Sequence, residues 1–392
     1  MSRQKSSNPE VLTLRASKEK LPSNGERDRN LRQSILETEN QFAAFIGIDR
    51  SDRYLDVCLQ AADSRTPGHE HSRIASAPEA VAQWIAQMTA RFPGGTLAIC
   101  VEQPAVALLE HLAHWENVVL FPINPLTLAR YREAFTTSRA KDDASDAASL
   151  LELVVNHRDK LPVWRPDNAE TRSIVLLCEG RRKAIDLCTR LCNALLAHLK
   201  SYFPQALELC GNDLHSVLSC EFLSRWPSLQ KVKRSQEKTL RAFYNAHNCR
   251  SRVAIDNRLA LIKSSVAVSD DQALLRGSIP TTQMYAGQLK ALSQSIAEFD
   301  KELKKLLKAH EDASVFDSLP GAGPVHSARL LAAFGSDRER YENAADMQKY
   351  SGIAPVVKAS GKVRLVQRRF ARPLFMHQSF MEYSGQSILH CA

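Results

Sequence analysis

Acidic residues follow two short apolar runs that are typical of buried strands. Asp49 ends the run that begins at Phe42, and Glu102 follows the run that begins at Thr96. Because the carboxyl ends of neighbouring strands meet at one edge of a sheet, we expect these two carboxylates to converge there. Oxygen ligands gathered in this way are what Mg²⁺ ions need to align the attacking and leaving oxygens of a phosphodiester.

A further pair of acids opens a predicted helix. Asp143 and Asp146 lie three residues apart, so they share one face of that helix. Each acid taken alone is more often a turn residue or a partner of the helix dipole. The combined order, a strand with Asp, a strand with Glu and a helix with Asp-x-x-Asp, is much harder to obtain by chance and favours a shared metal site.

A serine lies among cations towards the C-terminal end. Ser360 precedes Gly361, a pair typical of a tight turn, and a hydroxyl that only caps the backbone is the more frequent arrangement there. Unbalanced cations around such a turn suit phosphate contacts better than a solvated face does. The stretch contains six cations and no acid: Lys358, Lys362, Arg364, Arg368, Arg369 and Arg372.

Two glycines upstream predict another phosphate contact. Gly321 and Gly323 lie in the segment Leu319-Pro-Gly-Ala-Gly-Pro324, which has the form of a helix-hairpin-helix turn. Glycine allows the backbone to turn tightly and to present N–H groups to a phosphate at the start of a helix. A plain glycine turn between two helices explains the segment about equally well.

The elements that position these residues differ along the chain. Strand and helix patterns alternate in the first half, which predicts an α/β domain. Long helical patterns over about 170–203 and 282–309 could pair antiparallel, with a small basic helical insertion between them. The last segment favours a mostly α domain. We therefore expect a mobile tail at 1–40 and domains at 41–168, 169–312 and 313–392.

The charge is divided unevenly among these segments. The chain of 392 residues carries 52 Lys and Arg against 43 Asp and Glu, a net charge of +9. Residues 41–170 have a net charge of −5, whereas residues 171–313 and 314–392 have net charges of +8 and +4. An acidic module suits cations, and basic modules suit nucleic acid.

Several classes of protein are excluded. No run of eighteen apolar residues predicts a membrane span, and the first residues lack the apolar core of a secretory signal. The nine scattered cysteines do not form a disulfide framework, so we expect a cytoplasmic protein with reduced thiols. The chain has neither a phosphate-binding Gly-x-x-x-x-Gly-Lys motif nor a dinucleotide fingerprint.

Two smaller features are interpreted as structural. Cys188 and Cys192 lie one helical turn apart, but Cys178 and His198 fall on other faces of the same predicted helix. We therefore expect core cysteines rather than a zinc site. His71 lies in a polar segment that predicts a surface loop.

Taken in order, these motifs resemble the DEDD transposases, insertion-sequence recombinases that are guided by a structured bridge RNA. The RuvC-like, ribonuclease-H-fold half of that family is similar to residues 42–165, and its second half is similar to residues 315–385. The motifs that carry the resemblance are Gly47-Ile-Asp49, Val101-Glu102, Asn124-Pro125, Lys141-Asp-Asp-Ala-Ser-Asp-Ala147, Leu319-Pro-Gly-Ala-Gly-Pro324, Gly352-Ile-Ala-Pro355 and Ser360-Gly361.

The resemblance implies a fold and a chemistry. It implies Ser360 as a nucleophile, DNA as substrate, a structured guide RNA, a dimer or tetramer of the chain, and a place in the bacterial cytosol or nucleoid. Asp142 leaves open which neighbouring aspartate belongs to the metal site. Relatives continue as further helices where this chain ends, so we expect a truncated C-terminal domain. The implied Mg²⁺ ligands are Asp49, Glu102, Asp143 and Asp146.

Two other functions fit the same residues. A hydrolytic ribonuclease-H-fold nuclease or junction resolvase would use water where a transposase uses the serine. A truncated transposase would bind nucleic acid without cutting it. A nuclease leaves free ends and is never joined to DNA, whereas a binding remnant gives no product.

Overall fold

The chain folds into two compact units, with the boundary after Pro166. The computed structural model describes residues 42–63, 68–103, 105–135, 143–211, 213–337, 340–341, 343–361, 363–370 and 372–390. The expected tail at 1–40, Asp142 and Lys362 lie outside the described residues. The expected spacer and C-terminal domains fall within one unit. The long helices of the spacer pack directly on helices of the C-terminal domain.

A five-stranded mixed sheet forms the centre of the first unit. The strand order is β3-β2-β1-β4-β5, in which β1, β4 and β5 are parallel and β2 and β3 are antiparallel. This order is consistent with the expected ribonuclease-H-like α/β domain. The strands are β1 (Phe42–Arg50), β2 (Tyr54–Ala61), β3 (Glu70–Ala75), β4 (Thr96–Glu102) and β5 (Val118–Ile123).

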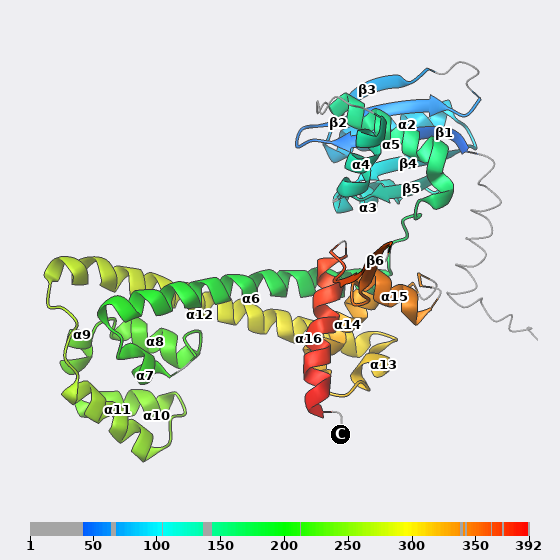
Figure 1. The fold of residues 1–392 in the computed structure, drawn as a ribbon. Helices are drawn as coiled ribbons and strands as arrows, with labels where there is room; N and C mark the ends of the chain where they lie inside the picture. Colours follow the sequence, from blue (N-terminus) through cyan, green and yellow to red (C-terminus); the bar gives the residue numbers. More distant parts are fainter. Residues whose placement is uncertain are drawn as a thin grey trace, which may run out of the picture. The chain divides into compact units, whose positions relative to one another are not determined.

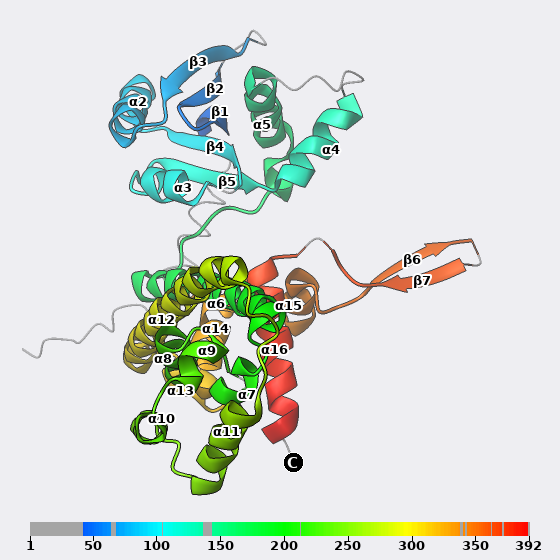
Figure 2. The same cartoon turned by 90° about the vertical axis from the view of Figure 1, so that its left-hand side faces the viewer.

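Helices cover both faces of this sheet (Figure 2). Helices α2 (Pro78–Arg91) and α3 (Val106–Leu112) pack on one face, where Ile46, Ile48 and Ile99 are buried. Helices α4 (Pro125–Phe135) and α5 (Asp143–His157) pack on the other face and are followed by the short turn η1 (Arg158–Lys160). Because both faces are covered, the central strands are nearly continuous apolar runs, which made them recognisable in the sequence.

Strand β3 was not expected, and it corrects the interpretation of His71. The segment around His71 is polar and was assigned to a loop, but it forms an antiparallel edge strand beside β2. Its side chains are mostly exposed, so it lacks the apolar pattern by which a strand is recognised. The imidazole of His71 lies 3.7 Å from the thiol of Cys58, between Nε2 and Sγ.

Two long antiparallel helices form the spine of the second unit (Figure 1). Helix α6 (Ala169–Tyr202) begins at Asn168, whose side chain accepts a hydrogen bond from the Thr171 backbone N–H, as expected of an N-cap. It pairs along its length with α12 (Gln272–Ala309). Gly180 allows close packing at their contact, because a Cβ there would lie 3.0 Å from the ring of Phe299. The expected antiparallel pairing is confirmed.

Helix α12 begins ten residues earlier than expected. The sequence-based boundary was placed beyond Pro280 because proline inside a helix removes a hydrogen bond. The helix nevertheless runs through Pro280, since Leu275 and Ser278 before it are buried against the rest of the unit. Tertiary packing thus outweighs the local preference.

The insertion between the long helices is helical, as expected, and shares an apolar core with both of them. Phe203, Phe222 and Tyr244 are fully buried at its centre. Its helices are α7 (Ala206–Cys210), α8 (Val217–Arg225), α9 (Leu229–Lys233), α10 (Glu237–Ala246) and α11 (Arg252–Ser264).

The C-terminal segment consists of four helices and one hairpin. Helix α14 lies on both long helices and on α16, while the strands β6 and β7 form a hairpin that projects from the helices (Figure 2). The elements are α13 (Ala313–Asp317), α14 (Gly323–Phe334), α15 (Ala344–Ser351), β6 (Val356–Ser360), β7 (Val363–Gln367) and α16 (Leu374–His390). None of the helices formed by the described residues has the length and apolarity needed to cross a lipid bilayer.

Candidate functional site

The two strand-ending acids meet at one edge of the sheet. Strands β1 and β4 are parallel neighbours, and Ile48 pairs with Val101 immediately before Asp49 and Glu102. Both acids lie on the sheet face that α5 covers, because side chains alternate along a strand and Gly47 and Cys100 are paired on that face. Asp49 is only 9% exposed, so the sheet holds its carboxylate at a defined place.

Helix α5 brings Asp146 to the same face. It contacts the sheet so closely that a Cβ at Gly47 would lie 2.1 Å from the backbone oxygen of Ala147. Asp146, one residue before that contact, is 2% exposed and forms an ion pair with Arg132 of α4. Position 143 is the first residue of α5.

Another buried acid was missed by sequence reasoning. Asp56 of β2 pairs directly with Asp49 across the antiparallel strands and is itself buried. The Nε of Arg73, on β3, donates a hydrogen bond to its carboxylate at 2.8 Å. A signal was available, because Asp56 lies between Leu55 and Val57 within a strand, where an exposed turn acid is not expected.

This acidic edge, formed by Asp49, Asp56, Glu102 and Asp146, suits a hard cation. Its side chains offer only carboxylate oxygens, the ligands that Mg²⁺ prefers. Burial of several carboxylates on one face is costly unless cations compensate them, and Arg73 and Arg132 compensate two of them. Among the described residues, no three carboxylates of this edge have oxygens that all lie within 4.8 Å of one another.

Ser360 lies at the tip of the projecting hairpin. It ends β6, pairs with Val363 of β7, and is followed by Gly361 with a φ of +56°, a conformation that favours glycine. The hydroxyl is exposed, as are the apolar side chains of Val363 and Val366. The serine is therefore presented to a partner outside the body of the unit.

The hairpin register divides the cations into two groups. Lys358 lies two residues before Ser360 and therefore on the same face, whereas Arg364 pairs with Ala359 and lies on the opposite face. Lys358, Arg364, Arg368 and Arg369 form no ion pair among the described residues. The Nε of Arg369 is buried without a hydrogen-bond partner in that part of the chain, which suits an acceptor from elsewhere.

The glycine turn before α14 is present, but one side of it is covered. Gly321 and Gly323 both have positive φ values, of +70° and +52°. A Cβ at Gly321 would lie 2.6 Å from the imidazole of His390 in α16, whereas the space at Gly323 is open. Helix α13, before the turn, has only five residues, so the pattern of a helix-hairpin-helix is not established.

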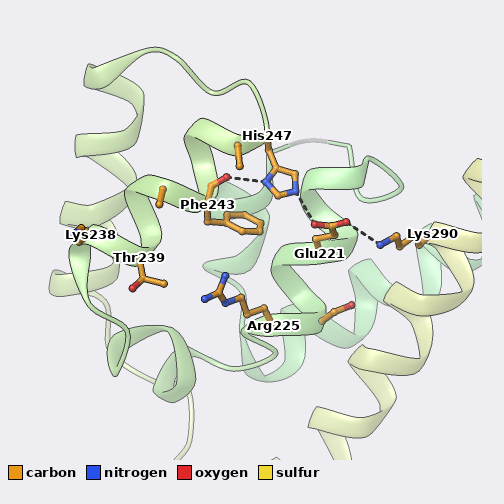
Figure 3. A pocket seen from close by; sticks show the side chains of 10 residues that line it. Glu221, Arg225, Lys238, Thr239, Phe243, His247 and Lys290 are labelled. Atoms are coloured by element: carbon orange, nitrogen blue, oxygen red, sulfur yellow. Dashed lines mark hydrogen bonds and ion pairs between the residues drawn. The ribbon is translucent and has the colours of Figure 1, made fainter.

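A cavity of about 780 Å³ lies elsewhere, in the helical insertion (Figure 3). Lys290 Nζ donates to Glu221 at 2.9 Å, and His247 Nε2 lies 3.0 Å from the other oxygen. These hydrogen bonds hold the pKa of Glu221 below its usual range. Glu221 is the one acid among the described residues that line the cavity, so it lacks the paired carboxylates found at the sheet edge.

Comparison with known proteins agrees with this arrangement of two modules. A DEDD transposase model of the IS110 type matches residues 46–204, and the transposase model of the IS116/IS110/IS902 family matches residues 313–374. Together these matches cover more than half of the chain, and they define the class of the protein as an insertion-sequence transposase. The chain belongs to the IS110/IS116/IS902 family.

The individual relatives have low sequence identity to this chain. The chain is 28% identical over 272 residues to the "Mini-circle putative transposase for IS117" of Streptomyces coelicolor, covering 64% of this chain and 62% of the relative. It is 28% identical over 254 residues to an IS116 protein of Streptomyces clavuligerus, covering 64% and 61%. A protein of IS900 from Mycobacterium paratuberculosis is 23% identical over 320 residues, covering 78% and 77%. The chain thus spans about three fifths of the length of the first two relatives.

Proposed function

We propose that this chain cleaves and rejoins DNA, with a divalent cation at the acidic edge and Ser360 as the nucleophile. The proposed ligands are Asp49, Glu102, Asp143 and Asp146. The observation that carries the proposal is the placement of Asp49 and Glu102 at adjacent ends of parallel strands, beneath the helix that supplies Asp146. Membership of a transposase family supports the same chemistry.

The proposed reaction transfers a DNA strand to the protein. The Oγ of Ser360 gives up its proton to water and forms a bond to phosphorus. The bond from phosphorus to one strand oxygen breaks, and that oxygen takes a proton from water and leaves as a hydroxyl. A serine hydroxyl is a weak nucleophile and needs a base or a polarised target. Mg²⁺, when bound, supplies that polarisation. Lys358, on the face of Ser360, stabilises the charge that develops on the phosphoryl oxygens.

The proposal requires two parts of the protein to meet on one phosphate. The carboxylates belong to the first unit and the serine to the second, so they must approach either within one chain or between two copies. We propose that they meet between two copies in a homo-oligomer, as the family resemblance implies. By analogy with the family that the motifs resemble, we propose a structured guide RNA as a further partner.

The experiment compares protein–DNA adducts on a denaturing gel. Ser360→Ala is expected to fold and to bind DNA and RNA but to form no adduct, because the attacking oxygen is absent. Ser201→Ala removes an exposed hydroxyl of α6 and serves as the matched control, with wild-type adduct formation expected. Cleavage by Ser360→Ala at the wild-type rate would favour the water-using nuclease. No product from the wild-type chain, with DNA binding retained, would identify a remnant that only binds.

A further inference from the structure

Two cysteines of α6 and a histidine of the helical insertion come together. The ligand atoms of Cys188, Cys192 and His215 all lie within 4.8 Å of one another. The two thiols come from successive turns of α6, and the imidazole comes from the loop between α7 and α8. Sequence reasoning found no third ligand because it searched only the helix that carries the cysteines. The third ligand instead comes from 23 residues further along the chain.

The loop holds the histidine in a defined orientation. Asp213 Oδ1 lies 2.5 Å from Nδ1 of His215, so Nε2 is the ring nitrogen available to an ion. The hydroxyl of Ser293, on α12, donates a hydrogen bond to the backbone oxygen of His215 at 2.8 Å. A carboxylate that fixes the far nitrogen of a histidine is a common outer partner of metal-binding imidazoles.

We propose that Cys188, Cys192 and His215 bind a zinc ion. Thiolate and imidazole are the donors that select a borderline-soft ion such as Zn²⁺, whereas Mg²⁺ prefers oxygen. Binding releases the two thiol protons, because the ligands are thiolates. Three protein ligands leave one tetrahedral position, which water fills from the exposed side of His215. Cys220 is not a ligand, since its thiol contacts the backbone oxygen of Leu214 at 3.6 Å.

The ion would join α6 to the loop after α7. Cys188 is 6% exposed and lies in the apolar core, whereas Cys192 is half-buried and His215 is exposed. An ion at this place would tie the loop after α7 to α6, while Ser293 ties the same loop to α12. The site therefore stabilises the beginning of the helical insertion. It includes none of the carboxylates of the first unit.

The experiment measures metal in the full-length chain. One zinc per chain is expected after purification, and replacement by Co²⁺ should give thiolate-to-cobalt charge-transfer absorption. The double variant Cys188→Ser/Cys192→Ser should lose both signals. Cys249→Ser, which removes another partly buried cysteine of the insertion, should keep both. Asp213→Asn should keep the absorption but weaken Zn²⁺ binding by about 10–100-fold, the usual effect of losing an outer partner.

Other results would overturn the assignment. Absence of thiolate absorption with Co²⁺ would show that the thiols bind no metal. An equal loss in Cys249→Ser would show that the effect is general and not local. A disulfide between Cys188 and Cys192 in protein purified without oxidant would identify a redox pair in place of a zinc site. Unchanged zinc in Asp146→Asn is expected, because that variant alters only the acidic edge.

Discussion

The acidic edge and the serine hairpin are built in opposite ways. The acids lie on a sheet covered on both faces, and the exposed fractions of Asp49 and Asp146 are only 9% and 2%. Ser360 lies on an isolated pair of strands with exposed apolar side chains. A lone two-stranded hairpin is marginally stable in water, so a partner surface must complete it. Under the proposed function, this difference would give the cation a rigid site and leave Ser360 to be ordered by its substrate.

The largest expected effect comes from replacing Asp143, which the proposed function assigns to the cation in preference to its neighbour Asp142. Asp143→Asn should abolish strand cleavage, because Asp143 is one of the four proposed cation ligands. Removal of like charge should at the same time slightly stabilise the metal-free fold. Product formation on sequencing gels and the melting temperature would be measured together. Asp142→Asn is the control, and loss of cleavage there with full activity in Asp143→Asn would contradict the register.

The close contact beneath the acids can be broken without changing any charge. Gly47→Ala should destabilise the first unit by about 1–3 kcal/mol, because the new methyl group meets the backbone of α5. Cleavage should fall with it, since α5 positions Asp146. Gly287→Ala, on an exposed and open position of α12, should instead stabilise the chain by about 0.5–1 kcal/mol. Urea unfolding would measure both, and equal effects would contradict the inferred packing.

A partly buried ion-pair cluster joins α16, the helix that follows the hairpin, to α6 and α14. Glu382 of α16 pairs with Arg182 of α6 and with Arg329 of α14, whose side chain is 7% exposed. Glu382→Gln should cost about 2 kcal/mol, below the usual cost of breaking a buried pair because Glu382 is itself 35% exposed. Thermal unfolding would measure the loss, and Glu302→Gln on the exposed side of α12 should change little.

The same cluster predicts a pH dependence. Burial acts to raise the pKa of Glu382, but its hydrogen bonds and ion pairs with Arg329 and Arg182 lower it overall. A lowered pKa in the folded state means that the stabilisation is present above the ordinary glutamate pKa and is lost as the pH falls through the folded value. Acid unfolding of the wild type should therefore begin at a lower pH than acid unfolding of Glu382→Gln. The difference in stability between the two proteins should shrink as the pH falls. A constant difference would contradict this assignment.

The smallest effect is expected from replacing single cations on the two faces of the hairpin. Lys358→Gln should slow adduct formation about tenfold, because it removes charge from the face of Ser360. Arg364→Gln is the matched control on the opposite face and should slow the reaction less. Single-turnover rates at saturating DNA separate this effect from binding. A larger loss in Arg364→Gln would show that the hairpin approaches DNA by its other face.

Much of the candidate site could be predicted from order and spacing. The apolar runs before Asp49 and Glu102 are long enough to be recognised as buried strands, and parallel pairing then places the acids together. Arg73 could not be found in this way, because β3 is an exposed edge strand with no apolar pattern. Asp56 could have been found, because it lies between Leu55 and Val57 in the recognisable strand β2. Likewise, the start of α12 could not be predicted, since burial of Leu275 outweighs the proline that follows it.

The sequence by itself determined the two modules, their opposite charges and the motifs that mark the family. These features are local, since they depend on residue type and on spacing within one strand, helix or turn. Only the tertiary structure decided which side chains share a face: Asp56 opposite Asp49, Lys358 beside Ser360, and His215 beside Cys188. Such pairings depend on strand register and on contacts between distant segments. They are fixed by the packing of the whole core, and no short stretch of sequence contains that information.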